Sequence, residues 1–153
     1  MPELKYACLL VDTREKESEK LTDHLIGEWG FKICRDAYKT ELSCMTGEPE
    51  EAFHIYPGYT VITVTDTKKC LGFVSLYVDI EAKTLIVGHA YVRPEVREKG
   101  IYRMMLKRAE KFAKDTGMRK IIAFVYRANG GSMKAHKELG FKQDMVGYTK
   151  EVK

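Results

Sequence analysis

The strongest constraint on the fold is a region in which a strand pattern, a helix pattern and a second strand pattern follow one another. Residues 85–92 are apolar, rich in β-branched and aromatic types and soon followed by Pro94, which predicts a strand that ends there. From 101 to 113 apolar residues recur at helical spacing, which predicts an amphipathic helix. Residues 120–126 predict a buried strand. A strand, a helix and a strand in this order form a right-handed crossover with parallel strands.

The loop between the first strand and the helix combines a glycine with basic residues. It reads Arg-Glu-Lys-Gly-Ile-Tyr at 97–102. A helix N-terminus leaves about four amides without an intrahelical acceptor and carries partial positive charge. A loop that enters such a helix through Gly100, flanked by Arg97, Lys99 and Arg103, therefore suits a phosphate or pyrophosphate. The alternative stays open that Gly100 only makes the turn, because short motifs of this kind often arise by chance.

The other elements predict a mixed sheet. Three apolar segments at 59–65, 70–79 and 83–92 are separated by turns too short for a parallel crossover, so we expect antiparallel strands. At 153 residues the chain is long enough for one buried core, and we expect a single domain over 1–153. The remaining expected elements are a strand at 6–11, helices at 14–28 and 36–45, a short helix at 132–139 and one or two strands within 141–152.

The loop also resembles that of a known family. Residues 92–101, Val-Arg-Pro-Glu-Val-Arg-Glu-Lys-Gly-Ile, are similar to the acyl-CoA loop of the GNAT N-acetyltransferases. The core of that loop is Gln or Arg, two residues, Gly, one residue, and then Gly or Ala. Arg97 and Gly100 match this core. Tyr102 stands where the family usually has a small residue.

A second motif lies downstream, in the order and at about the distance that the family shows. Residues 129–132, Asn-Gly-Gly-Ser, are followed by His136 and by Leu-Gly-Phe at 139–141, which resembles the family's Asn and Gly-Phe pattern around its last core helix. Two partial motifs together are more specific than either alone. The resemblance covers residues 60–150 well and the first 60 by length and outline. It implies that residues 31–57 build the substrate pocket.

The resemblance implies an α/β fold of mixed type, a GNAT-like and mostly antiparallel sheet flanked by helices. Its two parallel strands would splay apart beyond a bulge, with Gly88 a candidate bulge position, to bind acyl-CoA. Acetyl-CoA would be the cosubstrate, with pantetheine on the strand's main chain and pyrophosphate on the loop amides. The Tyr102 ring must then point away from the phosphates, or the loop must shift. The implied cofactor-binding residues are Ala90, Tyr91, Val92, Arg97, Glu98, Lys99, Gly100, Ile101, Tyr102, Asn129 and Ser132. Asn129 could equally be a helix cap for Ser132.

The implied reaction is acetyl transfer from acetyl-CoA to a primary amine by direct attack in a ternary complex, without a metal. The acceptor would be a small-molecule or peptide amine, and an acid must protonate the departing thiolate. Family members often carry Tyr four residues before the Gly of Gly-Phe, and His136 occupies that position here. An ordinary pKa of about 6.5 suits a proton donor, so His136 is the candidate catalytic residue. The alternative is an exposed helix histidine, with Tyr126, Tyr148 or water as the donor.

A base that deprotonates the amine is harder to assign. The glutamate that some family members carry on the strand before the loop would fall near Ile86, which cannot serve. His89 lies on the opposite face of that strand by strict alternation, so we expect it to be packed or hydrogen-bonded rather than a base. Deprotonation through ordered water, with no single base, stays open.

Charge is unevenly distributed along the chain. Residues 1–60 carry 7 Lys and Arg against 12 Asp and Glu, whereas residues 61–153 carry 19 against 10, which leaves a net charge of +4. A basic half fits an anionic ligand such as CoA, and an acidic half fits a cationic amine. Ordinary solvated helix faces would give similar counts, so this asymmetry is weak support.

The four cysteines contain no C-x-x-C pair, which argues against a zinc site or a redox motif. Cys8 and Cys70 lie in apolar runs, where we expect their thiols to act as core side chains. The N-terminal residues do not match a signal peptide, and no apolar run approaches ~18 residues, so we expect a cytoplasmic protein with no membrane partner. A homodimer is compatible with the resemblance, because family members often dimerise.

Two other functions stay open. A non-catalytic CoA-binding module of the same fold is favoured by the missing Tyr and Glu of the family. A nucleic-acid-binding domain would use the basic face of the helix at 101–116. That surface lacks interleaved aromatic residues, so we expect no nucleic acid partner.

Overall fold

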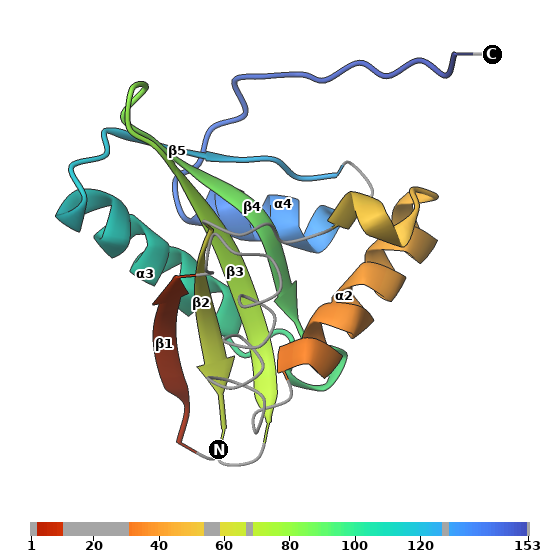
Figure 1. The fold of residues 1–153 in the computed structure, drawn as a ribbon, viewed down its shortest axis with the longest axis horizontal. Helices are drawn as coiled ribbons and strands as arrows, with labels where there is room; N and C mark the ends of the chain where they lie inside the picture. Colours follow the sequence, from red (N-terminus) through yellow and green to blue (C-terminus); the bar gives the residue numbers. More distant parts are fainter. Residues whose placement is uncertain (1–2, 11–30, 54–58, 67–68, 127–128, 153) are drawn as a thin grey trace.

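The computed structural model describes residues 3–10, 31–53, 59–66, 69–126 and 129–152 (Figure 1). They form a mixed five-stranded sheet with helices on both faces, which confirms the fold class expected from the sequence. The expected helix at 14–28 lies outside the described residues. The strands are β1 (Lys5–Leu10), β2 (Thr60–Thr65), β3 (Cys70–Asp79), β4 (Thr84–Val92) and β5 (Lys120–Ala123); the helices are α2 (Phe31–Thr46), α3 (Ile101–Asp115) and α4 (Gly130–Glu138), with short 3-10 helices η2 (Glu50–Phe53) and η3 (Pro94–Val96).

The sheet order β1-β2-β3-β4-β5 follows the chain. The first four strands pair antiparallel, and β4 and β5 pair parallel. Short turns join β2 to β3 and β3 to β4, whereas α3 carries the chain over one face of the sheet to β5. Gly117, with φ +76°, follows the end of α3. The antiparallel strands and the crossover are thus confirmed, although β5 ends at Ala123 rather than at 126 and α2 begins at Phe31 rather than at 36.

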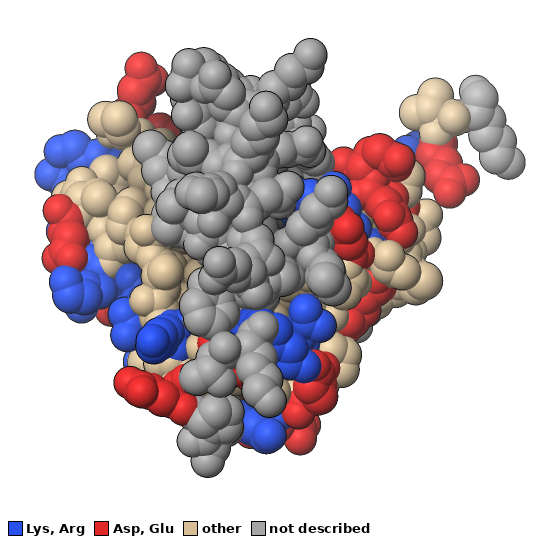
Figure 2. Space-filling model, turned by 60° about the horizontal axis from the view of Figure 1, so that its bottom comes forward, with Lys and Arg blue, Asp and Glu red and all other residues tan. Residues whose placement is uncertain are grey.

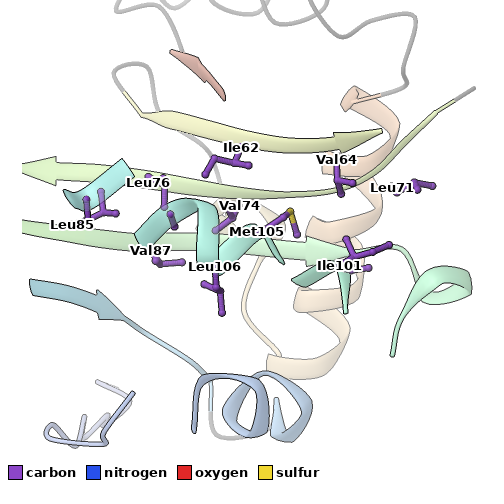
Figure 3. Close-up of a cluster of buried hydrophobic side chains, with 13 residues drawn as sticks. Ile62, Val64, Leu71, Val74, Leu76, Leu85, Val87, Ile101, Met105 and Leu106 are labelled. Carbon is purple, nitrogen blue, oxygen red and sulfur yellow. The ribbon is translucent and has the colours of Figure 1, made fainter. Parts of the chain in front are cut away.

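Two clusters of buried side chains cover the two faces of the sheet. Alternation along a strand sends neighbouring residues to opposite faces. In β3, Val74 and Leu76 pack under α3, whereas Phe73 packs under α2. Figure 3 shows the cluster on the α3 face, in which Met105 and Leu106 of the helix lie against strands β2 to β4. The amphipathic stripe of α3 is therefore what seals this face.

Gly88 lies at a bulge between β3 and β4, as expected. Val74 pairs with Ala90 and Leu76 pairs with Val87, so two β4 residues oppose the single residue Ser75. The Ser75 hydroxyl accepts a hydrogen bond from the His89 amide at 2.8 Å. A Cβ at position 88 would lie 3.2 Å from the same Oγ, which explains why glycine suits this position.

Two expectations from the sequence are wrong. Residues 141–152, all described, contain no strand, and Figure 1 shows this segment leading away from the sheet. Tyr148 and Val152 are largely exposed there, so the segment lacks the packing partner that a strand needs. Cys70 is buried as expected, but Cys8 is exposed, because β1 is an edge strand with fewer neighbours.

No helix in the described ranges is long and apolar enough to cross a membrane.

Acidic and basic side chains are interspersed on the face drawn in Figure 2. Acidic side chains are densest at the right of that view, and basic ones lie mainly at the left and below. On the described part of this face, the acidic and basic side chains do not separate into patches of a single sign, although the two halves of the sequence differ in net charge.

Candidate functional site

The two parallel strands separate half-way along β4. The pairing of β4 with β5 runs from Thr84 opposite Lys120 to Val87 opposite Ala123 and stops there. β4 itself continues to Val92 while remaining paired to β3 on its other edge. Within the described residues, the main-chain groups on the β5 side of β4 beyond Val87 therefore have no strand partner. This is the splayed edge that the sequence predicts, and it contains Ala90, Tyr91 and Val92.

The splayed edge leads directly into the loop and the N-terminus of α3. Glu98 and Gly100 both have left-handed backbone conformations, with φ values of 62° and 77°. The Met104 amide donates to the Gly100 carbonyl at 3.0 Å, which is the first turn of the helix. The amides of Ile101 to Arg103 precede that bond, so the helix itself offers them no acceptor. Among the described residues, no atom lies within 4 Å of the position that a Cβ at Gly100 would take.

Arg97 makes contacts away from the loop amides. Its Nη2 donates to both carboxylate oxygens of Glu41 in α2 at 2.7 Å, and its Nε donates to the Val92 carbonyl at 2.8 Å. The guanidinium carbon lies 5.5 Å from the centre of the Tyr91 ring. The hydrogen bond to Glu41 is the main reason that the pKa of Arg97 is raised above its usual value. The side chain of Arg97 therefore joins the loop to α2.

The Tyr102 ring points from α3 toward α4. Its hydroxyl lies 3.1 Å from Nε2 of His136 and 3.4 Å from Oγ of Ser132. Burial raises the pKa of Tyr102 to about 12, so the phenol keeps its proton and can donate to Nε2. The Tyr102 ring is thus turned toward α4. The resemblance required a large residue at this position to point away from the expected phosphate site, and this orientation agrees with that requirement.

His136 is buried, with an exposed fraction of 6%, so the alternative of an exposed helix histidine is wrong. Its Nδ1 lies 2.7 Å from the Ser132 carbonyl, which can only accept, so Nδ1 carries the proton. Nε2 is then the acceptor for Tyr102. Burial is the larger effect and lowers the pKa of His136, and the bond to the Ser132 carbonyl opposes it. At neutral pH His136 is therefore a neutral imidazole, and its role as a catalytic acid stays a prediction.

Asn129 caps helix α4. Its Oδ1 accepts a hydrogen bond from the Ser132 amide at 3.1 Å, which confirms the cap expected from the sequence. Gly130 and Gly131 begin the helix, and a Cβ at either would meet nothing within 4 Å. The proposed contacts of Asn129 and Ser132 with the cofactor stay predictions.

A histidine and a tyrosine meet on the α2 face, next to the point where β4 leaves β5. Nδ1 of His89 lies 2.6 Å from the hydroxyl of Tyr38 in α2. Leu85 and Val87 face α3, but beyond the bulge Tyr91 packs in the cluster under α2. The expectation that His89 lies on the face opposite Ile86 is therefore wrong, because the extra residue at the bulge reverses the alternation.

Aromatic rings surround this pair. The Tyr38 ring packs edge-on against Phe53 and Phe73 at 5.9 and 5.4 Å between centroids. Phe53 in turn packs against Tyr126, which follows β5, at 5.8 Å. The aromatic rings on the α2 side of the splay therefore come from α2, η2, β3 and the segment after β5. Apolar walls with a few polar groups are typical of small-molecule sites.

Residues 20–141 match the family model described as the acetyltransferase (GNAT) family. The chain belongs to this family. That stretch contains the splayed strands, the loop, α3, α4 and the Gly-Phe motif. No curated protein sequence matches the chain significantly.

Solved structures with a similar fold are acetyltransferases at low sequence identity. A ribosomal-protein-alanine N-acetyltransferase from Brucella melitensis biovar Abortus 2308 has a TM-score of 0.69 and 16% identity, with 99% of this chain and 100% of that chain covered. The aminoglycoside acetyltransferase meta-AAC0020 from an uncultured soil metagenomic sample, in complex with sisomicin, has a TM-score of 0.65 and 9% identity, with 98% and 97% covered. AAC(6')-Iy in complex with the bisubstrate analog CoA-S-monomethyl-acetylneamine has a TM-score of 0.59 and 13% identity, with 98% and 99% covered. At these identities the likeness establishes the fold.

The main departure of this GNAT chain from the family's loop pattern is Tyr102, and the structure accounts for it through α4. Sequence reasoning missed the Arg97–Glu41 and Tyr38–His89 contacts, whose partners are 56 and 51 residues apart. For His89 a signal was present, because a glycine inside a strand pattern indicates a bulge and a bulge changes which residues share a face.

Proposed function

We propose that the protein transfers an acetyl group from acetyl-CoA to a primary amine by direct attack in a ternary complex. The amine nitrogen would attack the thioester carbonyl, the C–S bond would break, and the proton lost by nitrogen would balance the proton gained by the CoA thiolate. The observation that carries the proposal is the end of β4–β5 pairing at Val87, because β4 continues from there to the open N-terminus of α3.

The cofactor would lie along this edge. Pantetheine amides would pair with main-chain groups of Ala90 to Val92, as an added strand pairs with a sheet edge. The diphosphate would receive hydrogen bonds from the loop and from the first amides of α3, since a helix N-terminus attracts anions. Gly100 supports this contact because it has no side chain of its own, and no atom of the described residues lies within 4 Å of the position that a Cβ would take.

The acceptor would approach from the α2 side of the splay. The Tyr38–His89 pair and the aromatic rings around it lie on that side, next to the last β4–β5 pair. A small-molecule or peptide amine is the proposed class. The names of the similar structures include aminoglycoside acetyltransferases and a ribosomal-protein-alanine N-acetyltransferase. The choice between a small-molecule amine and a peptide amine is therefore left to experiment.

The proton for the thiolate is assigned to His136 together with Tyr102. The Tyr102 hydroxyl lies on Nε2, so a proton given up by the phenol can be replaced from a protonated His136. Because burial lowers the pKa of His136, the share of protonated imidazole is small at neutral pH. This assignment predicts that transfer slows when either group is removed.

The experiment that tests the site is acetyl-CoA titration of a matched pair of variants by calorimetry. Gly100→Asp places a carboxylate at the start of α3, and Gly117→Asp places one just beyond its other end. Both glycines have similar positive φ values, 77° and 76°, and open surroundings. We expect binding to be lost in Gly100→Asp and retained in Gly117→Asp. Equal affinity of both variants would overturn the assignment of the loop.

A CoA-binding module without transfer is the second candidate. It is favoured by the burial of His136, whose ring nitrogens both make hydrogen bonds inside the protein. Release of free CoA thiol in the presence of a panel of amines separates the two candidates. Binding without thiol release across that panel would support the module.

A further inference from the structure

The hydrogen bonds between Arg97 and Glu41 join the proposed cofactor loop to helix α2. We propose that Glu41, on the acceptor-side helix α2, is a positioning residue for acetyl-CoA. Through Arg97 it holds the loop in the conformation that presents the amides at the start of α3. This inference rests on the proposed function and adds a residue that the family's loop motif does not contain.

Arg97 is held on three sides. Both carboxylate oxygens of Glu41 accept from Nη2 at 2.7 Å, the carbonyl of Val92 accepts from Nε at 2.8 Å, and the ring of Tyr91 lies under the guanidinium. Because Nη2 and Nε donate to partners in two different elements, the guanidinium is fixed in orientation as well as in place. The loop is therefore tied at one residue to the end of β4 and to α2 at once.

The loop needs such an anchor because its backbone is unusual and exposed. Glu98 directly follows Arg97 and has a φ of 62°, a backbone conformation that residues other than glycine rarely adopt. Such conformations persist only where neighbouring contacts enforce them. Glu98, Lys99 and Gly100 are all exposed, so packing of their own side chains does little to fix the path into α3.

Removal of the Glu41 charge has two opposing consequences. It would free the positive charge of Arg97 near the diphosphate, which favours binding, and it would release the loop, which weakens binding. The positioning role requires the second effect to dominate. The sign of the change in affinity therefore distinguishes an anchor from a mere counter-ion.

The test is calorimetric titration of CoA into Glu41→Gln, Arg97→Gln and the double variant. Because the ion pair is partly exposed, we expect each single variant to bind CoA about threefold to fivefold more weakly. The double variant should bind no more weakly than Arg97→Gln alone, because both residues act through one contact. At saturating acetyl-CoA we expect kcat to stay within twofold and KM for acetyl-CoA to rise. Glu95→Gln is the matched control, because Glu95 lies near the same loop in an ion pair with Lys69 at 2.8 Å. It removes the same charge but none of the hydrogen bonds that Arg97 makes to Glu41 and Val92, and we expect a change below twofold.

Hydrogen exchange of the ligand-free protein separates this inference from the proposed function. We expect faster exchange of the amides at 98–103 in Glu41→Gln and unchanged exchange in Glu95→Gln. An unchanged or tighter affinity for CoA in Glu41→Gln, additive losses in the double variant, or unchanged exchange of those amides would each overturn the anchor. If the wild-type protein bound no CoA, the proposed function would fail, and the exchange experiment would still test the anchor.

Discussion

The hydroxyl of Tyr38 in α2 lies 2.6 Å from Nδ1 of His89 in β4. Burial raises the pKa of Tyr38, so the phenol keeps its proton at neutral pH and can donate to Nδ1 of His89. This contact depends on the bulge beside Ser75, because without the extra residue His89 would face α3.

Removal of the Tyr38 hydroxyl should weaken both the fold and the α2 side of the site. We expect Tyr38→Phe to lower the free energy of unfolding by about 1 to 2 kcal/mol, because it removes the partly buried hydrogen bond between α2 and β4. Urea denaturation measures this change. Tyr77→Phe is the control, because Tyr77 is 46% exposed, and we expect a change within about 0.5 kcal/mol. Equal losses in the two variants would contradict the role of the hydrogen bond.

The bulge should respond to Gly88 and Ser75 as a unit. Gly88→Ala places a methyl group 3.2 Å from the Ser75 hydroxyl, and we expect it to cost about 1 to 2 kcal/mol. Ser75→Ala removes the acceptor of the His89 amide and should cost about 1 kcal/mol. In the double variant the clash is relieved, so the total loss should be smaller than the sum of the single losses. A strictly additive cycle in chemical denaturation would mean that the two positions do not share the bulge.

His136 should make stability depend on pH in a definite direction. Burial lowers its pKa in the folded protein below the ordinary value of about 6.5, so the unfolded chain binds a proton more readily. The stability from this residue is therefore present above about pH 6.5 and is lost as pH falls through the lowered pKa. We expect this part of the pH dependence to disappear in His136→Gln. Denaturation of both proteins between pH 5 and pH 8 measures it, and parallel curves would refute the buried neutral imidazole.

Tyr102→Phe should change the titration of His136 without removing the ring. The phenol donates to Nε2, which stabilises the neutral imidazole, so loss of the hydroxyl should raise the pKa of His136 toward its ordinary value. NMR titration of the imidazole protons reports this shift. We also expect slower acetyl transfer, because the proposed proton path passes through the hydroxyl. Tyr126→Phe should leave the titration unchanged, and a shift in that variant alone would contradict the Tyr102 contact.

Local patterns in the sequence were sufficient to predict most of the framework. Strands β2 to β4 follow from apolar runs with short turns, and α3 follows from its apolar stripe. Gly88 and Gly100 are at the bulge and at the helix start as predicted, because only a residue without a Cβ fits these backbones well.

Contacts between distant segments could not be predicted in this way. Arg97 was expected at the phosphate site. Its hydrogen bond to Glu41 was not predicted, because that bond depends on where α2 docks. The burial of His136 depends on Tyr102 reaching across from α3. The strands expected within 141–152 do not form, because the sequence of a segment does not show whether it has a partner to pack against.

Hydrogen exchange with and without acetyl-CoA tests the central claim most directly, because it locates the ligand on the backbone. The amides of Ala90 to Val92 that face the splay, and those of residues 98–103, should become protected when acetyl-CoA is added, while the amides of β1, which lies at the opposite edge of the sheet, should not change. Protection at the splayed edge and at the start of α3 is the predicted result. Unchanged exchange at both places with acetyl-CoA bound, or protection confined to the basic face of α3, would contradict a cofactor site between the parting strands.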